Sequence, residues 1–501
     1  MAAVAVDGAA ALRAALAAGA PGPIVAAAVT APPADVAAAA AAIARAIDAA
    51  SPTELAAAAA GMATDRAPAG AIATRLALVA AHTGDAAGLA RWRAVATAAP
   101  DGDPARLAAL PTPPVIAPDT VAVLLPLSGP FAAVGRELAA AIELAPLDGA
   151  RRLVLDSGGD PVLAAAAVDQ AAAAGAIAIL GPVGVREAEG AARRASRLGI
   201  PIALLAPADG ADPAAGVFRL VDSPESEARA AARFAAELGV ARVAVLAPRD
   251  EVGAAAADAF ATTASGLGLA VTARGDFDPT GGALEDDVKR FLGLDPATNP
   301  RLAAHLRRTG RRGWQTFSPD VAFALLYIPD RYDRAALVAS FLPYLGVEVH
   351  SDDFVDLDAL TRKHGGRTPQ VVQLLGSSGW NHPSLATRGG DAVEGALMLE
   401  PCPLGQGDLA SDAFAEAFRA RTRRDPSPAA AASHDAWRLV AAARTRAARA
   451  SQPRLAFVAA RAATTVDDGV CAPTGVGADG QLTRTPAVLK VDLGQLVVEP
   501  Y

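Results

Sequence analysis

The sequence predicts an α/β protein with two lobes, each built on a parallel sheet, preceded by an all-α domain. The first observation is length, because 501 residues suffice for about three folding units. The second is the alanine-rich composition of residues 1–110, which favours short helices. The third is the later alternation of short apolar runs with helix-length segments, which is typical of parallel sheets covered on both faces.

Residues 1–110 predict short helices that Pro and Gly clusters interrupt. Within them, Thr74–Pro100 predicts two helices around a turn at Gly84 and Asp85. Leu89, Trp92 and Val95 have helical spacing in the second helix. This helix pair resembles a tetratricopeptide-like unit, and a generic helical bundle is the alternative. A Pro-rich linker at 111–118 ends the helical domain.

Eight apolar runs beyond the linker predict strands, because each is short, rich in aliphatic residues and followed by a helix-length segment. We expect lobe 1 to hold about 119–225 and 373–400, lobe 2 to hold about 226–372, and both to take parts of the segment up to 499. The predicted strands are Val121–Leu125, Arg152–Leu155, Ile177–Leu180, Ile200–Leu205, Val243–Leu246, Leu269–Ala273, Val321–Ile328 and Val371–Leu375.

Composition and charge exclude several classes of protein. Hydrophobic residues make up 52% of the chain, which excludes an intrinsically disordered protein. The net charge of −8 argues against a protein that binds nucleic acid, because binding to phosphates needs a basic face. No strongly apolar run of membrane-spanning length occurs, and the N-terminus shows no signal peptide. Cys402 and Cys471 either form one disulfide or remain two separate thiols.

No cofactor or metal site is expected from the motifs. Gly475, Gly477 and Gly480 have the spacing of a dinucleotide fingerprint, but no strand leads into them and no helix follows, so a turn is predicted instead. The six histidines are scattered without metal-ligand spacing. No nucleophile–base pair supports an enzymatic activity.

The segment Val121–Phe131 (VAVLLPLSGPF), with Gly135 after it, resembles the opening strand and loop of type I periplasmic binding proteins of the leucine/isoleucine/valine-binding class. The run Gln373–Asn381 (QLLGSSGWN), with a helical domain ahead, is more similar to the branch of lipoprotein activators of penicillin-binding proteins. Further pieces of the family pattern follow in order over about 118–499: Asp156–Pro161, Ile179–Val183, Ile200–Leu205, Phe218-Arg219, Ala247–Gly253, Gly395-Ala396, Asp435-Ala436 and Gly480–Arg484.

The resemblance implies two Rossmann-like lobes around a cleft whose closure buries a ligand. Loops after Leu125, Leu180 and Leu205 are each expected to begin a helix whose free amides favour an anion such as a carboxylate. The ligand-binding positions that the resemblance implies are Ser128, Phe131, Gly181, Pro182, Gly184, Ala206, Ala208, Asp209, Asp250, Arg331 and Tyr332.

Several of these positions depart from the family pattern. Gly184 and Val185 stand where amino-acid binders commonly carry a serine, and Ala206 and Ala208 stand where they carry serine and threonine. Val252 replaces a frequent tyrosine. Because unmet polar groups in a closed site cost roughly 1–3 kcal/mol each, these departures argue against a tightly bound α-amino acid.

The resemblance therefore leaves two non-enzymatic functions open. The first is an extracytoplasmic solute-binding protein that recognises an amino acid, peptide or cell-wall fragment in the interlobe cleft and delivers it to an ABC permease. The second is an activator that docks a penicillin-binding protein and whose cleft is vestigial. Either implies a periplasmic or outer-membrane-associated location.

Overall fold

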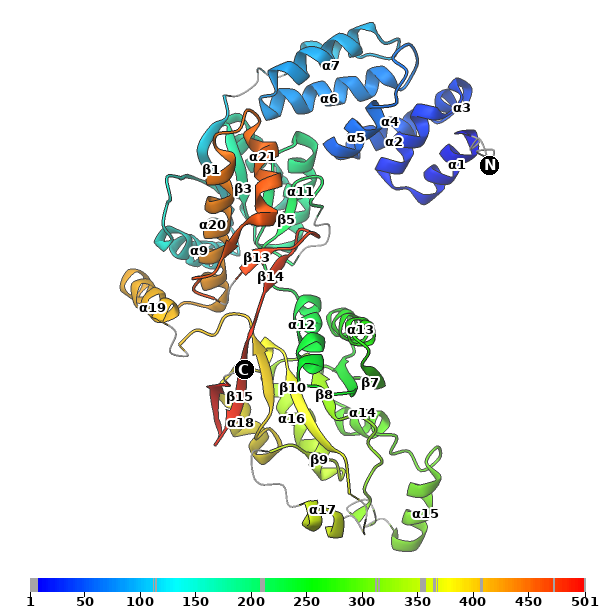
Figure 1. Ribbon diagram of the computed structural model, residues 1–501, viewed down its shortest axis with the longest axis vertical. Helices are drawn as coiled ribbons and strands as arrows, with labels where there is room; N and C mark the ends of the chain where they lie inside the picture. The colour runs from blue at the N-terminus through cyan, green and yellow to red at the C-terminus, as the bar shows by residue number, and fades with distance from the viewer. Residues whose placement is uncertain are drawn as a thin grey trace. The chain divides into compact units, whose positions relative to one another are not determined.

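The computed structural model describes residues 8–110, 112, 115–207, 212–310, 313, 316–351, 357–363, 366, 368–405, 409–471 and 474–499. The chain divides into two compact units. The first unit is Met1–Val221 with Leu409–Thr483, and the second is Asp222–Asp408 with Arg484–Tyr501. Figure 1 labels the elements of both units.

The N-terminal segment is helical, as predicted. Gly84 ends α6 in the left-handed conformation and Asp85 caps α7 by accepting a hydrogen bond from the Gly88 amide at 2.9 Å, so the predicted turn between these helices is confirmed. The tetratricopeptide-like arrangement stays a prediction. The helices are α1 (Gly8–Ala18), α2 (Pro21–Thr30), α3 (Pro33–Ala38), α4 (Ala40–Ala49), α5 (Pro52–Ala59), α6 (Ala69–Thr83), α7 (Ala86–Ala98) and α8 (Pro104–Ala108).

The first unit contains a five-stranded parallel sheet with the order β2-β1-β3-β4-β5. In its central strands, residues 120–125 of β1 and all of β3 are buried, because helices cover both faces of the sheet (Figure 1). The strands are β1 (Ala117–Leu125), β2 (Arg151–Asp156), β3 (Ala176–Leu180), β4 (Ile202–Leu204) and β5 (Val217–Arg219). The helices that follow the first three strands are α9 (Ala132–Leu144), α10 (Pro161–Ala173) and α11 (Val185–Leu198).

Residues 409–483 complete the first unit. Buried Arg454 joins the sheet to the N-terminal helices, because its guanidinium donates to the carbonyl oxygens of Ala176 and His82. The helices are α19 (Leu409–Thr422), α20 (Pro428–Ala447), α21 (Pro453–Ala460) and the 3₁₀ turn η4 (Arg461–Ala463). A small sheet of β12 (Thr465–Val466), β13 (Thr474–Val476) and β14 (Leu482–Arg484) follows, and its β13–β14 connection is the turn predicted at Gly477–Gly480.

The second unit is built on a larger mixed sheet with the order β16-β15-β11-β10-β8-β6-β7. Strands β7, β6, β8, β10 and β11 repeat the order of the first sheet and are parallel, whereas β15 and β16 are antiparallel. The strands are β6 (Arg242–Pro248), β7 (Ala270–Phe277), β8 (Leu325–Ile328), β10 (Val371–Gly376), β11 (Leu397–Glu400), β15 (Ala487–Asp492) and β16 (Gln495–Val498), with the short β9 (Glu348–Val349) beside β10.

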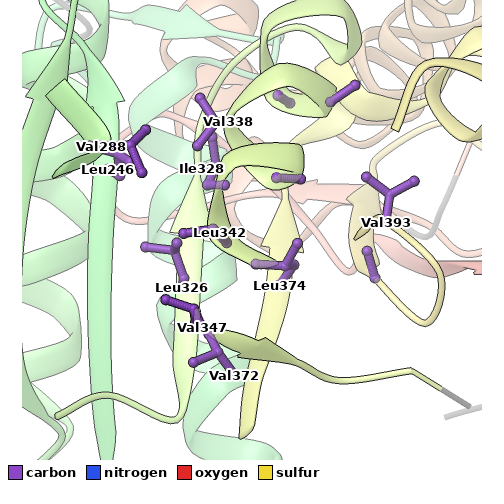
Figure 2. Packing of buried hydrophobic residues seen from close by; sticks show 14 of the residues in the cluster. Leu246, Val288, Leu326, Ile328, Val338, Leu342, Val347, Val372, Leu374 and Val393 are labelled. Carbon is purple, nitrogen blue, oxygen red and sulfur yellow. The ribbon is translucent and has the colours of Figure 1, made fainter. Parts of the chain in front are cut away.

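The side chains of alternate strand residues lie in two separate hydrophobic cores of this unit. Leu326 and Ile328 of β8 lie in one core, and Leu325 and Tyr327 lie in the other. Figure 2 shows the first core, where Val338 and Leu342 project from α16 toward the sheet. The helices are α12 (Pro224–Glu237), α13 (Glu251–Gly266), α14 (Leu284–Phe291), α15 (Pro300–Thr309), α16 (Tyr332–Tyr344), α17 (Leu357–Lys363) and α18 (Ser384–Gly389), with the 3₁₀ turns η2 (Ser378–Trp380) and η3 (Gly390–Ala392).

All eight predicted strands occur, but one lobe assignment was wrong. Segment 373–400 lies in the second unit, because β10 pairs with β8 and β11 pairs with β10 and β15. The linker predicted at 111–118 ends earlier than expected, because β1 begins at Ala117. Three of its prolines, Pro111, Pro113 and Pro114, lie outside the described residues.

Two further chain-wide features bear on function. Both cysteines, Cys402 and Cys471, are buried and disulfide-bonded. None of the helices in the described part of the chain combines the length and hydrophobicity needed to cross a lipid bilayer.

Candidate functional site

Each sheet has one switch point in its strand order, which is where ligands of such sheets bind. In the first sheet, β1 and β3 are neighbours whose following helices leave in opposite directions along the strand order, and β6 and β8 have the same relation in the second sheet. Ligands of open α/β sheets bind beyond the carboxyl ends of the strands at such a switch point. The loops after these four strands are therefore the candidate ligand positions.

In the first unit, the structure brings six predicted residues to this edge. Ser128 and Phe131 lie in the loop after β1 and are exposed, whereas Gly184, at the start of α11, is partly buried. Three others, Gly181, Pro182 and Ala206, are buried in the loops after β3 and β4. Ala208 and Asp209 lie outside the described residues.

Helices meet this edge closely because of two equivalent glycines. Gly135 in α9 lies over the carbonyl oxygen of Pro126, and Gly253 in α13 lies over that of Pro248. A Cβ atom at either glycine would be 2.1 Å from that oxygen. The absence of a side chain therefore lets α9 and α13 pack directly on the ends of β1 and β6.

The donors of the first loop are already used by a carboxylate of the chain. Asp156, at the end of β2, accepts hydrogen bonds from the amides of Leu127 at 2.8 Å, Ser128 at 3.2 Å and Gly158 at 2.8 Å. Desolvation acts to raise the pKa of Asp156, but these bonds and one from the Ser128 hydroxyl lower it overall. Asp156 therefore occupies the amides of Leu127 and Ser128. The N-caps of α9 and α11, Phe131 and Gly184, have no side-chain cap within the described residues, so the expected anion site stays a prediction.

A second carboxylate lies beneath the start of α11. Glu187 is only 2% exposed and accepts a hydrogen bond from the buried Ser157 hydroxyl at 2.6 Å. Burial raises the pKa of Glu187; the Ser157 bond opposes this rise, and the nearby charges of Asp156 and Asp160 add to it.

Of the other two expected helix starts, the one after Leu180 is present, because α11 follows β3. Asp160 caps α10 by accepting from the Val162 and Leu163 amides at 2.8 and 3.1 Å. No helix follows β4: in the described part of the loop, 205–207 and 212–216, the chain forms turns that lead to β5.

In the second unit, the predicted residues lie at the ends of β6 and β8. Asp250 caps α13, since its carboxylate accepts from the Gly253 amide at 2.7 Å. Arg331, exposed at the N-cap of α16, pairs with Asp333 at 3.5 Å. The Tyr332 ring stacks on His382 with centroids 3.8 Å apart, so one face of this ring is covered.

A buried acidic cluster adjoins the end of β10. The Glu227 carboxylate accepts from the Ser378 amide at 2.9 Å and from its hydroxyl at 2.8 Å. Burial raises the pKa of Glu227 to about 7, and Asp222 and Glu400 contribute in the same direction. The Ser378 hydroxyl therefore donates its hydrogen bond to a carboxylate and not to a histidine. This arrangement differs from a serine–histidine hydrolase site.

The roles of Asp156, Ser157 and Glu187 were not predicted from the sequence. Asp156 and Ser157 were noted only as part of the family pattern, and their partners come from other loops along the chain. The available signal was an Asp-Ser pair directly after a predicted strand. Among the described residues, no group of three or more His, Cys, Asp or Glu side chains is placed to hold a metal ion.

Comparison with known proteins identifies one family. A family model described as "Periplasmic binding protein" matches residues 118–293 and 352–495. No curated protein matches the sequence.

Solved structures with the same fold cover 76% of this chain. A protein from Rhodospirillum rubrum, named as a branched-chain amino acid ABC transporter, has 23% identity and a TM-score of 0.56, with 99% of its own chain covered. The C-domain of LpoA from Haemophilus influenzae, a regulator of PBP1A, has 15% identity and a TM-score of 0.52, with 100% covered. A substrate-binding protein from Sphaerobacter thermophilus has 18% identity, a TM-score of 0.52 and 96% covered.

Proposed function

Because this chain belongs to the periplasmic binding protein family, we propose that it is a non-enzymatic solute-binding protein that recognises a small ligand at the strand-end edges of its two sheets. One observation carries the proposal. In each unit, side chains at implied ligand positions are solvent-exposed beside the switch point, namely Ser128 and Phe131 in the first and Asp250 and Arg331 in the second.

The absence of catalysis is part of the proposal. The hydrogen bonds of two serines beyond strand ends support this part of the proposal. The Ser128 hydroxyl donates to Asp156, and the Ser378 hydroxyl donates to Glu227. A serine nucleophile needs a neighbouring base that accepts its proton and is oriented by a third group. Recognition without bond-making fits these contacts better.

We also propose a location outside the cytoplasm. The family name and the disulfide-bonded state of Cys402 and Cys471 support it, since disulfides persist in oxidising compartments. Delivery of the ligand to an ABC permease is part of the same proposal.

A second candidate function is regulation of a penicillin-binding protein. Two observations favour it: the fold is shared with the LpoA C-domain, described as a regulator of PBP1A, and the hydroxyl-bearing ligand positions are replaced by Gly184 and Ala206. In that case the strand-end edges contact a protein and no small ligand is bound.

A thermal-shift screen separates these functions. A ligand at a hundredfold excess over its Kd stabilises the folded chain by about 2.7 kcal/mol. We expect a shift with at least one small solute, and a smaller shift for Tyr332→Ala. The matched variant Tyr332→Phe keeps the ring on His382 and controls for lost packing. A silent panel together with capture of a purified penicillin-binding protein would favour the second function.

A further inference from the structure

We propose that the first unit holds a second ligand site, which binds a divalent oxyanion such as phosphate where the N-terminal helices meet α11. The site is independent of solute recognition at the strand-end edges. The edge of the first sheet lies at the first turn of α11, whereas this junction lies at its last turn. The proposal rests on the buried guanidinium of Arg75 in α6.

Arg75 is a buried cation whose two Nη atoms lack acceptors. The residue is only 2% exposed, and neither Nη atom has a hydrogen-bond partner among the described residues. Burial lowers the pKa of Arg75 to about 10, so the guanidinium still carries its charge at neutral pH. Burying a charge is costly unless the charge is paired and hydrogen-bonded. An anion bound to Arg75 would supply the acceptors that the described residues do not.

The face of α6 that carries Arg75 packs against two elements of the α/β part of the unit. Arg75, Val79 and His82 share this face, because they are spaced by four and three residues along the helix. A Cβ atom on Gly199, directly after α11, would be 3.0 Å from the Val79 side chain. Arg454 of α21 donates to the carbonyl oxygen of His82. The site therefore lies where three helices from distant parts of the chain meet.

Positive charge predominates around Arg75. Besides burial, the charges of three neighbouring arginines lower the pKa of Arg75, and Asp48 acts in the opposite direction. Burial also lowers the pKa of His82 to about 4, and the charges of Arg194 and Arg454 add to this effect, so the imidazole is neutral at pH 7. The ionisable groups that act on Arg75 or His82 have a net charge of +3 and are Arg75, Arg106, Arg194, Arg197, Arg454, Asp48 and Asp169.

Both carboxylates of this cluster already pair with other arginines. Asp48 pairs with Arg106 at 3.0 Å, and Asp169 pairs with Arg194 at 2.7 Å. In the described part of the chain, neither carboxylate forms an ion pair with Arg75. The resident acidic groups therefore leave the charge of Arg75 uncompensated.

A small anion with several oxygen atoms fits these donors. The two Nη groups of Arg75 lie in one plane, which matches bidentate binding of a phosphate or a carboxylate. Arg197, in the last turn of α11, is exposed and acts on the pKa of Arg75, so it is available as a further donor from the solvent side. The carboxyl ends of α6 and α11 offset only about half an elementary charge each. A divalent ion balances the remaining charge better than a monovalent carboxylate.

Isothermal titration of the full chain with sodium phosphate tests this site. The titration uses mildly alkaline chloride buffer of constant ionic strength, in which phosphate is mainly divalent. We expect one saturable site per chain for phosphate and for sulfate, and about tenfold weaker binding of acetate.

Variants of Arg75 test which side chain holds the anion. Arg75→Met keeps an unbranched side chain and removes the charge, so phosphate binding should weaken at least about tenfold. Arg193→Gln is the matched control, because Arg193 lies in the same helix as Arg197 but pairs with Glu189. The control should leave the Kd unchanged. If Arg75→Met does not fold, Arg197→Gln at an exposed position should still weaken binding about threefold.

Amide hydrogen exchange locates the bound anion. With phosphate, we expect slower exchange in α6 and α11 of the wild-type chain and no change in the second unit. Three results would overturn the inference: no saturable binding, an equal Kd for the wild type and Arg75→Met, or protection confined to other helices. Acetate that binds as tightly as phosphate would overturn the assigned ligand class. The solute-binding proposal has a separate test in the Tyr332 variants, so the two can fail independently.

Discussion

At the scale of single residues, Glu227 occupies an unfavourable environment for a charge. Its carboxylate is partly buried against Ser378, and its pKa is raised to about 7. The neighbouring side chains do not offset the cost of a negative charge on Glu227, because Asp222 and Glu400 are themselves acidic. The buried hydroxyl of nearby Tyr327 has no hydrogen-bond partner among the described residues.

This environment makes folding stability depend on pH. Because the folded-state pKa lies above the unfolded value near 4.5, protonated Glu227 contributes stability that is complete below pH 4.5 and lost as pH rises through about 7. We expect Glu227→Gln to raise the free energy of unfolding above pH 7 by up to about 3 kcal/mol. Urea unfolding at several pH values measures this. Glu225→Gln, in the same turn of α12, should not change the pH profile; a rise at high pH in both variants would refute the role of Glu227.

The sequence predicted where individual residues lie along the strands and loops better than it predicted their hydrogen-bond partners. Ser128, Phe131 and Asp250 lie beyond strand ends, as the resemblance implied, because that placement follows from local strand-loop-helix order. The bond between Ser157 and Glu187 joins side chains 30 residues apart, and sequence alone does not indicate which loops meet. The partners of Asp156 and Glu187 were not predicted for this reason.

At the scale of elements, the glycine near the start of α13 fixes how the helix meets its strand. We expect Gly253→Ala to lower the free energy of unfolding by about 1–3 kcal/mol, because its Cβ would overlap the Pro248 carbonyl oxygen. Denaturant unfolding tests this. Gly266→Ala in the same helix is the control, since no atom lies near its Cβ, and it should be neutral or stabilising by up to about 1 kcal/mol. Equal effects of both substitutions would contradict the close-packing argument.

Strand existence followed from apolar runs, whereas strand partners did not. The predicted runs at 243–246, 321–328 and 371–375 all became strands of one sheet. Their membership in a unit depends on pairing across long stretches of chain, which local periodicity does not encode. Segment 373–400 was therefore assigned to the wrong lobe.

At the scale of the whole molecule, the disulfide-bonded cysteines constrain the chain. We expect a thiol assay on the denatured, unreduced protein to find no free thiol, and Cys402→Ser with Cys471→Ser to lose about 2–4 kcal/mol of stability. The stability loss should match that of the wild-type chain measured in reductant. Two free thiols in protein isolated from an oxidising compartment would contradict the disulfide and weaken the proposed location.

The central claim is reversible recognition of a small solute without chemistry. Native mass spectrometry of the full chain, incubated with extracts of small metabolites, tests it most directly. We predict a single non-covalent adduct that is released on denaturation with its mass unchanged. Recovery of a chemically converted compound, or a chain that stays ligand-free in every extract, would contradict the claim.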